Sequence, residues 1–215
     1  MRILSVIITF FLSLASFAQS FDKGNRNFDV KLDFAAYSGT VQDNQMPDSI
    51  VSSGAASIIL TPQMEWGTGK RISIGTSLAY SHYLDSSGST GNKPRLNGLD
   101  ANFNFNFHFL RKPKTDVMVG FKLGIAGIRL NPNDGTGDVY GSMGSAWGLN
   151  FTGRFFVSDK VGIIANLAFP NYWFSKFGKN LDQTYAIRFK GVSFGAGVAI
   201  KLAAKSGSDT KVIQD

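Results

Sequence analysis

The sequence predicts an all-β chain that folds as an eight-stranded antiparallel up-and-down transmembrane β-barrel. Three observations predict this fold class: alternation of apolar and polar residues, eight such segments bounded by turn residues, and connections that alternate in length. The clearest alternation runs from Leu99 to Phe109, where four phenylalanines share one phase and three asparagines share the other. Because successive side chains of a strand point to opposite faces, we expect one face to contact lipid and the other to line a polar lumen.

The N-terminal residues 1–18 are predicted to form a signal peptide. Arg2 supplies its positive charge, residues 3–14 its apolar stretch, and Ala18 the last position of a small-residue cleavage site. This apolar stretch is shorter than the roughly 20 residues that a spanning helix needs. We therefore expect cleavage after Ala18, a barrel over residues 19–202, and a short polar periplasmic tail over residues 203–215.

The composition fits a wall that faces lipid and excludes several kinds of chemistry. Hydrophobic residues make up 43% of the chain and charged residues only 17%, a composition that fits a protein whose exterior does not have to face water everywhere. Cysteine is absent, which rules out disulfides, thiol catalysis and thiolate metal sites. The net charge is +7, yet no basic run or basic helix indicates nucleic acid, and anionic lipid headgroups are the expected partners. We expect no cofactor.

Each predicted strand reaches the roughly 9–11 residues that a tilted strand needs to cross a bilayer. In chain order the expected strands cover residues 28–37, 55–66, 71–83, 98–109, 116–128, 145–157, 161–173 and 184–202. The apolar phases of the first three and of the fifth to seventh contain no Asp, Glu, Lys or Arg, and only His82 interrupts them. In the last segment the apolar phase changes after Phe189, so we expect a β-bulge near Lys190 and Gly191.

The connections alternate strictly between short and long. Short turns are expected at residues 67–70, 110–115 and 158–160, and long polar connections at residues 38–54, 84–97, 129–144 and 174–183. Bacterial barrels pair short periplasmic turns with longer extracellular loops. The long connections are therefore expected to lie outside the cell and to bind any extracellular ligand or protein.

The polar phase of the strands is expected to fill the lumen, because an eight-stranded barrel has little interior space. Its polar network comprises Asp29, Lys31, Asp33, Glu65, Asn102, Asn104, Asn106, Lys122, Asn150, Arg154, Arg188 and Lys190. Structural packing of a closed lumen is the favoured interpretation, and a narrow ion or water path is the alternative. The expected interfacial aromatic residues are Tyr37, Trp66, Tyr80, Trp147, Trp173 and Tyr185.

Together, the signal peptide, the eight alternating segments and the loop asymmetry resemble the small outer-membrane barrels of diderm bacteria, the OmpA/OmpX-like and opacity-type class. The resemblance implies location in the outer membrane and a non-enzymatic structural or surface-interaction role through the long loops. Members of this class also include a few lipid-modifying enzymes, so the fold alone does not select a function. Unlike many members, the last strand does not end in an aromatic residue, since Phe194 is the last one in the chain.

Three alternatives remain open at this point. A soluble lipocalin-like barrel would turn the apolar phase inward to carry a small apolar molecule. A lipid-modifying enzyme would need a histidine near the outer rim, where His82 lies, although in the lipid-facing phase. The segment 131–138 is rich in Asn, Asp and Gly and resembles a calcium loop, but ordinary turn chemistry explains it equally well. No catalytic or metal-binding residue is assigned.

Overall fold

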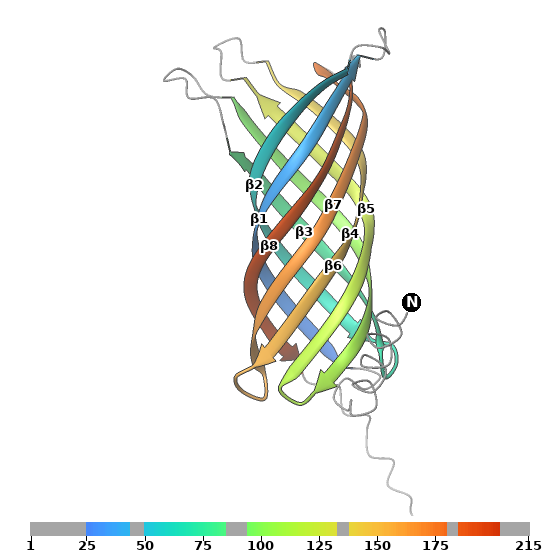
Figure 1. The fold of residues 1–215 in the computed structure, drawn as a ribbon, viewed down its shortest axis with the longest axis vertical. Coiled ribbons are helices and arrows are strands. Elements are labelled where there is room, and N and C mark those ends of the chain that lie inside the picture. Colours follow the sequence, from blue (N-terminus) through green and yellow to red (C-terminus); the bar gives the residue numbers. More distant parts are fainter. Residues whose placement is uncertain (1–24, 44–49, 85–93, 133–137, 180–184, 203–215) are drawn as a thin grey trace, which may run out of the picture.

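The chain forms a closed barrel of eight antiparallel strands, which confirms the predicted fold class (Figure 1). The computed structural model describes residues 25–43, 50–84, 94–132, 138–179 and 185–202. The strands are β1 (Arg26–Asp43), β2 (Ile50–Gly67), β3 (Ile72–Leu84), β4 (Arg95–Lys112), β5 (Thr115–Asn131), β6 (Tyr140–Phe156), β7 (Val161–Lys179) and β8 (Tyr185–Leu202). The predicted signal peptide and polar tail lie outside the described residues. In the described part of the chain, no helix is long and apolar enough to cross a membrane.

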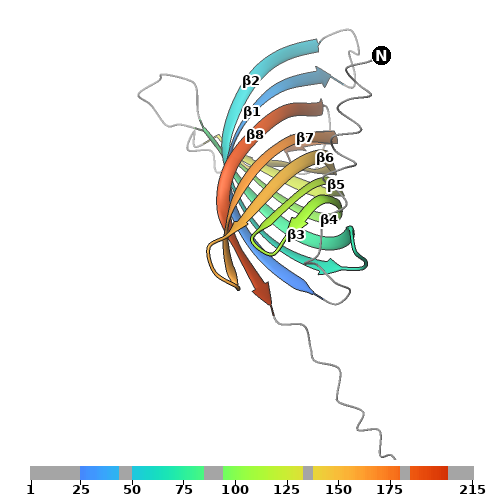
Figure 2. The ribbon, with the colours of Figure 1, turned by 60° about the horizontal axis from the view of Figure 1, so that its bottom comes forward.

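Each strand pairs with its neighbours in the sequence, and β1 closes the barrel by pairing with β8. The β1–β8 ladder is continuous from Arg26 opposite Leu202 to Asp43 opposite Tyr185. Because every strand has two partners, no edge of the sheet is left open. Figure 2 shows the strands running obliquely around one axis, as closure of a small barrel requires.

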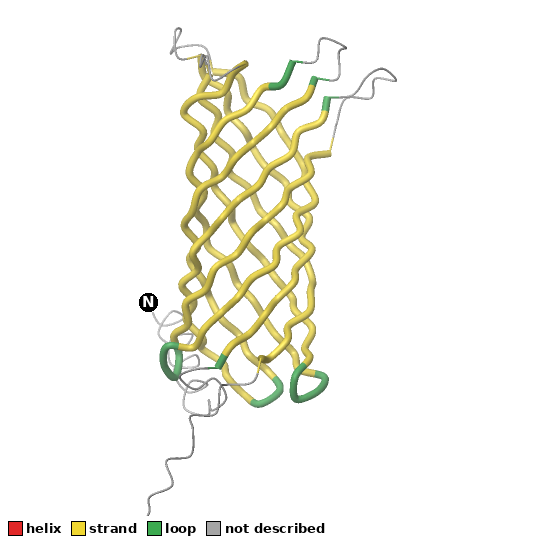
Figure 3. The backbone as a smooth tube through the Cα atoms, turned by 180° about the vertical axis from the view of Figure 1, so that it is seen from behind, coloured by secondary structure: helices red, strands yellow, loops and turns green. Residues whose placement is uncertain are grey.

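The short connections all lie at one end of the barrel, here called the short-turn end (Figure 3). The first strand begins and the last strand ends at this same end. At the opposite end, here called the long-connection end, the strands continue further than the sequence predicts. β1, for example, extends to Asp43 instead of ending at Tyr37. Apolar alternation stops at the membrane margin, whereas backbone pairing continues beyond it, and this explains the shorter prediction.

The outer wall is apolar around the middle of the barrel. Large apolar side chains such as Leu99, Phe103, Leu123 and Leu149 are exposed on it, and many others form the same band. An exposed apolar surface of this extent is unstable in water and is typical of a wall embedded in lipid. The inside-out arrangement of a lipocalin-like barrel is therefore not the one observed.

The expected bulge near Lys190 and Gly191 is absent, and the prediction for this strand is wrong. The β8 ladder with β1 has one register throughout, so Ile187 and Phe189 face the lumen and are buried. Arg188 and Lys190 accordingly face outward and are exposed. The physical reason is that the apolar residues change sides where β8 passes the membrane margin toward the long-connection end. Beyond this margin the outer wall meets water and is polar, whereas the lumen is filled by aromatic residues.

Candidate functional site in the barrel lumen

The lumen contains most of the predicted polar network. Asp29, Lys31, Asp33, Glu65, Asn102, Asn104, Asn106, Lys122, Asn150 and Arg154 all belong to the lumen-facing phase of their strands. Arg188 and Lys190 do not, for the reason given above. The lumen side chains form three layers: a charged network at the short-turn end, a middle amide-rich layer, and an aromatic cluster toward the long-connection end.

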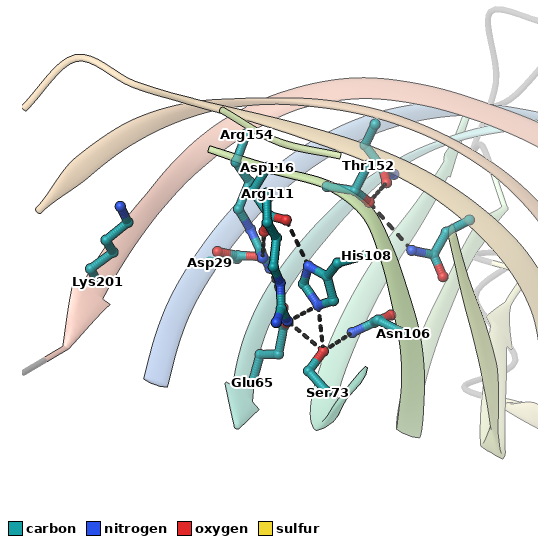
Figure 4. A network of polar contacts seen from close by, with 12 residues as sticks. Asp29, Glu65, Ser73, Asn106, His108, Arg111, Asp116, Thr152, Arg154 and Lys201 are labelled. Atoms are coloured by element: carbon teal, nitrogen blue, oxygen red, sulfur yellow. Dashed lines mark hydrogen bonds and ion pairs between the residues drawn. The ribbon is translucent and has the colours of Figure 1, made fainter. Parts of the chain in front are cut away.

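The charged network is built around Arg154 of β6 (Figure 4). Its guanidinium donates from Nη1 to Asp116 Oδ2 at 2.9 Å, from Nη2 to Asp29 Oδ2 at 2.5 Å, and from Nη2 also to Glu65. The side chains of Arg154, Asp29 and Glu65 are all 0% exposed. One planar cation therefore joins three carboxylates from β1, β2 and β5, and a guanidinium suits this because its five donors are fixed in one plane.

A histidine completes the charged network. His108 Nδ1 lies 2.6 Å from Asp116 Oδ1, and His108 Nε2 lies 3.0 Å from Glu65 Oε1. Both ring nitrogens thus face carboxylates, and this arrangement suits an imidazole ring that donates from both nitrogens. An imidazole ring protonated at both nitrogens would add a second cation beside Arg154 and offset the repulsion among the three acidic groups. The charged network comprises Asp29, Glu65, Ser73, His108, Asp116 and Arg154.

Ser73, His108 and Asp116 have the connectivity of a serine hydrolase triad. Ser73 Oγ lies 2.8 Å from His108 Nε2, on the side of the ring opposite Asp116. The same hydroxyl, however, donates to Glu65 Oε1 at 2.5 Å, so its proton is directed at a carboxylate. A ring that donates from both nitrogens cannot take the serine proton, and Ser73 is completely buried. These side chains therefore pack the lumen and lack the properties of a nucleophilic site.

A β-bulge in β4 adds Arg111 to the short-turn end of the lumen. The register with β5 shifts between His108 and Leu110, which turns the next odd-numbered side chain inward. Arg111 is fully buried and donates from Nη1 to the carbonyl oxygens of Gly69 and Lys70. It thereby ties the end of β4 to the turn between β2 and β3.

Sequence reasoning missed part of this network. His108 continues the phase of the predicted Asn102–Asn106 ladder, and Asp116 shares its phase with Lys122, so their placement could have been read from the alternation. Ser73 lies in the inward phase of β3 and carried no other signal. Arg111 could not be placed, because the bulge that turns it inward leaves no mark in the hydrophobic pattern.

The middle layer is rich in amides and is filled by side chains. Asn166 donates to Asp33 Oδ1 at 3.0 Å, and Lys31 Nζ donates to Gln63 Oε1 at 2.8 Å. Gly120 makes room for this layer: a side chain at that position would overlap with the amides of Asn106 and Asn150. Small residues on one strand therefore accommodate large amides on its neighbours.

An aromatic cluster closes the lumen toward the long-connection end. It consists of Tyr37, Tyr83, Tyr172, Phe174 and Phe189, all buried and contributed by four strands. The ring centroid of Tyr37 lies 5.8 Å from the ring centroid of Tyr83, 6.0 Å from that of Tyr172 and 6.1 Å from that of Phe189. These separations are those of packed aromatic pairs. Buried Ile59, Ile128 and Ile187 surround the rings.

Tyr37 was expected at the membrane interface, and this prediction is wrong. Its ring lies inside the barrel because odd-numbered residues of β1 face the lumen along the whole strand. Of the remaining interfacial predictions, Trp66, Tyr80, Trp147 and Trp173 have side chains on the outer wall, where Trp66 is partly exposed and the others are exposed. Tyr185 shares the inward phase of Ile187 and Phe189 and is exposed at the rim of the long-connection end, so the prediction that places it on the wall is wrong. A tyrosine at the end of a predicted strand can lie on the outer wall or in the lumen, and only the strand register decides between these two positions.

The described residues contain no group of three or more His, Cys, Asp or Glu side chains that could hold a metal ion. The central part of the calcium-like segment, residues 133–137, lies outside the described residues. His82 is exposed on the outer wall, where His82 Nδ1 lies 2.9 Å from Asn97 Oδ1. Its neighbour Ser81 is buried on the opposite face of β3. A strand thus separates the two groups that an enzyme at this rim would need to combine.

Comparisons with known proteins bear on the fold. No family model matches the chain, and no curated protein matches it in sequence. Among solved structures, the outer membrane protein AlkL in lipid bilayers is similar with a TM-score of 0.50 and 11% identity, covering 88% of this chain and 95% of that chain. Neisserial surface protein A matches with a TM-score of 0.49 and 13% identity over 81% and 97% of the two chains. OprG from Pseudomonas aeruginosa matches with a TM-score of 0.48 and 10% identity over 87% and 100%.

At these identities the likeness concerns architecture and does not extend to activity or partners. It agrees with the closed barrel of eight antiparallel strands. The chain has the fold of the small eight-stranded outer-membrane β-barrels.

Proposed function

We propose that this protein is a non-enzymatic, integral protein of the bacterial outer membrane that acts through its outer surface. The single observation that carries the proposal is the double closure of the lumen, by the charged network at one end and the aromatic cluster at the other. Solutes are not expected to pass through a barrel filled in this way. We therefore expect the protein to act by binding at its outer wall and at the long-connection end. Binding residues in general concentrate on loops held by a rigid scaffold.

In this proposal the signal peptide is cleaved after Ala18, the short-turn end faces the periplasm and the long-connection end faces the medium. Outer-membrane lipid surrounds the wall. A ligand or protein partner binds at the connections predicted over residues 38–54, 84–97, 129–144 and 174–183. Strands occupy the margins of all four connections, which supports the proposal, since rigid margins hold a binding surface in place.

The proposal is tested by labelling single cysteines in intact cells, which the cysteine-free sequence makes simple. Ser52 is exposed at the long-connection end and Lys114 is exposed at the short-turn end. A membrane-impermeant maleimide is expected to label Ser52→Cys and to leave Lys114→Cys unlabelled until the outer membrane is opened. Labelling of Lys114→Cys alone would reverse the orientation. Recovery of either labelled variant in the soluble fraction of lysed cells would argue against a membrane barrel.

The non-enzymatic role is tested separately. If His82 supported lipid modification, a His82→Ala variant would change the lipid composition of the outer membrane. We expect mass spectra of extracted outer-membrane lipids to be identical for His82→Ala, for the wild type and for a strain that lacks the protein. A lipid species that depends on the protein would overturn this part of the proposal.

A further inference from the structure

The outer wall carries a cationic patch where β1, β7 and β8 meet near the long-connection end. Arg188 and Lys190 both point outward from β8 and are exposed. The register sets Arg188 between Thr40 of β1 and Trp173 of β7, and Lys190 between Ser38 of β1 and Asn171 of β7. Two cations thus lie side by side on the wall, flanked by hydroxyl and amide groups.

This cationic patch lies directly above the apolar band of the wall. One step further along β8, the outward residue is Val192, which is exposed and pairs with Ala36. Trp173 is 50% exposed, and the Arg188 guanidinium carbon lies 5.5 Å from the centre of its ring. Tryptophan prefers the level of lipid headgroups, and a cation over its ring face is stabilised by the π system. The patch therefore lies at headgroup level in a bilayer.

A hollow with a volume of about 340 Å³ runs through the cationic patch. Its lining consists of Ser38, Thr40, Gln42, Ile50, Ala186, Arg188 and Lys190. Every one of these positions belongs to the outward phase of its strand, so the hollow opens on the wall and not into the lumen. The lining supplies two cations, two hydroxyls and an amide, and it contains no carboxylate. Such a set of donors matches the oxygens of a phosphate ester.

We infer that this patch binds the phosphate of a glycolipid headgroup in the outer leaflet, with Arg188 and Lys190 as the binding cations and Ser38 and Thr40 as hydrogen-bond donors. The inference rests on the proposed outer-membrane location. The wall below the patch is in contact with acyl chains, so the nearest anionic group is a headgroup attached to those chains. A guanidinium can bind phosphate with two parallel hydrogen bonds, and the ammonium adds a second charge.

The barrel also offers a matched control for non-specific attraction. Arg95 of β4 and Arg129 of β5 are likewise exposed on the outward phase near the long-connection end. The hollow beside Arg129 is lined mainly by apolar and backbone groups of residues such as Leu99 and Met143. Replacing this pair removes the same charge from the same end without touching the patch.

The test measures the affinity of the full barrel in detergent micelles for diphosphoryl lipid A. Fluorescence of Trp173 reports binding in a Trp66→Phe/Trp147→Phe background, where it is the only tryptophan. We expect Arg188→Gln/Lys190→Gln to weaken binding roughly 30-fold, the effect of two cations beside an anionic surface, and Arg95→Gln/Arg129→Gln to weaken it less than about threefold. Equal losses in both variants, or no loss in either, would overturn the inference.

Two further binding measurements distinguish a lipid phosphate from free inorganic phosphate as the ligand. Chemically dephosphorylated lipid A with the same acyl chains is expected to bind the wild type as weakly as diphosphoryl lipid A binds Arg188→Gln/Lys190→Gln. Millimolar inorganic phosphate is expected not to compete, and competition at that concentration would make the patch a site for free anions and overturn the lipid assignment. Heat-modifiable gel migration verifies that each variant is folded. The micelle assay does not depend on orientation, so its outcome is independent of the cysteine-labelling test above.

Discussion

The two ends of the lumen are closed by opposite chemistry. At the short-turn end, Arg154 and His108 join three buried carboxylates, next to a small apolar cluster of Phe156, Ile164 and Ala199. At the other end, Tyr37, Phe174 and Phe189 pack ring against ring. Both regions fill the same narrow lumen with buried side chains. A barrel of this width can therefore be filled either by complementary charges or by aromatic packing.

The two regions are expected to differ in how much stability the barrel loses when one side chain is removed. An aromatic cluster that loses one ring keeps its remaining contacts and gains a cavity. A charged network that loses its central cation is left with buried carboxylates that repel one another, and this costs more. The charged network is therefore expected to be the more fragile of the two closures, although both are equally buried.

The largest effect is expected for Arg154→Gln. This change removes the cation shared by Asp29, Glu65 and Asp116, and breaking a buried ion pair costs about 3–5 kcal/mol. We expect the free energy of unfolding in lipid vesicles, measured by urea titration, to fall by that amount. Arg26→Gln at the same end serves as the control, because Arg26 is exposed and its replacement is expected to change stability by less than about 0.5 kcal/mol. An equal effect of both changes would contradict the network's role.

Phe174→Ala is expected to have the next largest effect. Phe174 is fully buried within the aromatic cluster, and its truncation leaves a cavity that costs about 3 kcal/mol. The same urea titration measures it. Phe155→Ala, on the lipid-facing wall, is the matched control and is expected to cost clearly less, because Phe155 is half exposed. A smaller loss for Phe174→Ala than for Phe155→Ala would show that the cluster does not stabilise the barrel.

A smaller effect is expected where the aromatic cluster meets the polar lumen. Tyr172 donates its hydroxyl proton to Asp100 Oδ2 at 2.7 Å, and both side chains are buried. Tyr172→Phe leaves the carboxylate without this donor, at a cost of about 1–3 kcal/mol. Tyr185→Phe at the exposed rim of the long-connection end is expected to be neutral within about 0.5 kcal/mol. If the two variants have the same stability, this hydrogen bond does not couple the two layers.

The sequence predicted the wall better than the lumen, and the reason is physical. Lipid imposes an apolar outer phase on every strand, so residues such as Phe103 and Leu149 mark the strands and their faces directly. The lumen imposes no single chemistry, because charges and aromatic rings fill it equally well. Ile187 and Phe189 are as apolar as Val192 and Phe194, and only the continuous register with β1 assigns them to opposite faces.

The partners of the charged network were also beyond sequence reasoning. Arg154 and Asp29 are 125 residues apart and meet only because the tilt of the strands brings their side chains to one height. Their inward phase was readable, whereas their pairing depends on the stagger of the whole barrel. The outward position of Arg188 was missed because the apolar phase reverses at the membrane margin.

The charged network and the aromatic cluster are each expected to close the lumen independently of the other. Single-channel recording in planar bilayers tests it most directly, with the wild type, a Tyr37→Ala/Phe174→Ala variant and an Arg154→Gln variant compared under the same voltage. We predict no steady open steps in the wild type, and none in either variant because the other closure remains in place. Steady conductance through the folded wild type would show that the lumen is open, and steady conductance through a variant in which one region alone is altered would show that the two regions do not close it independently.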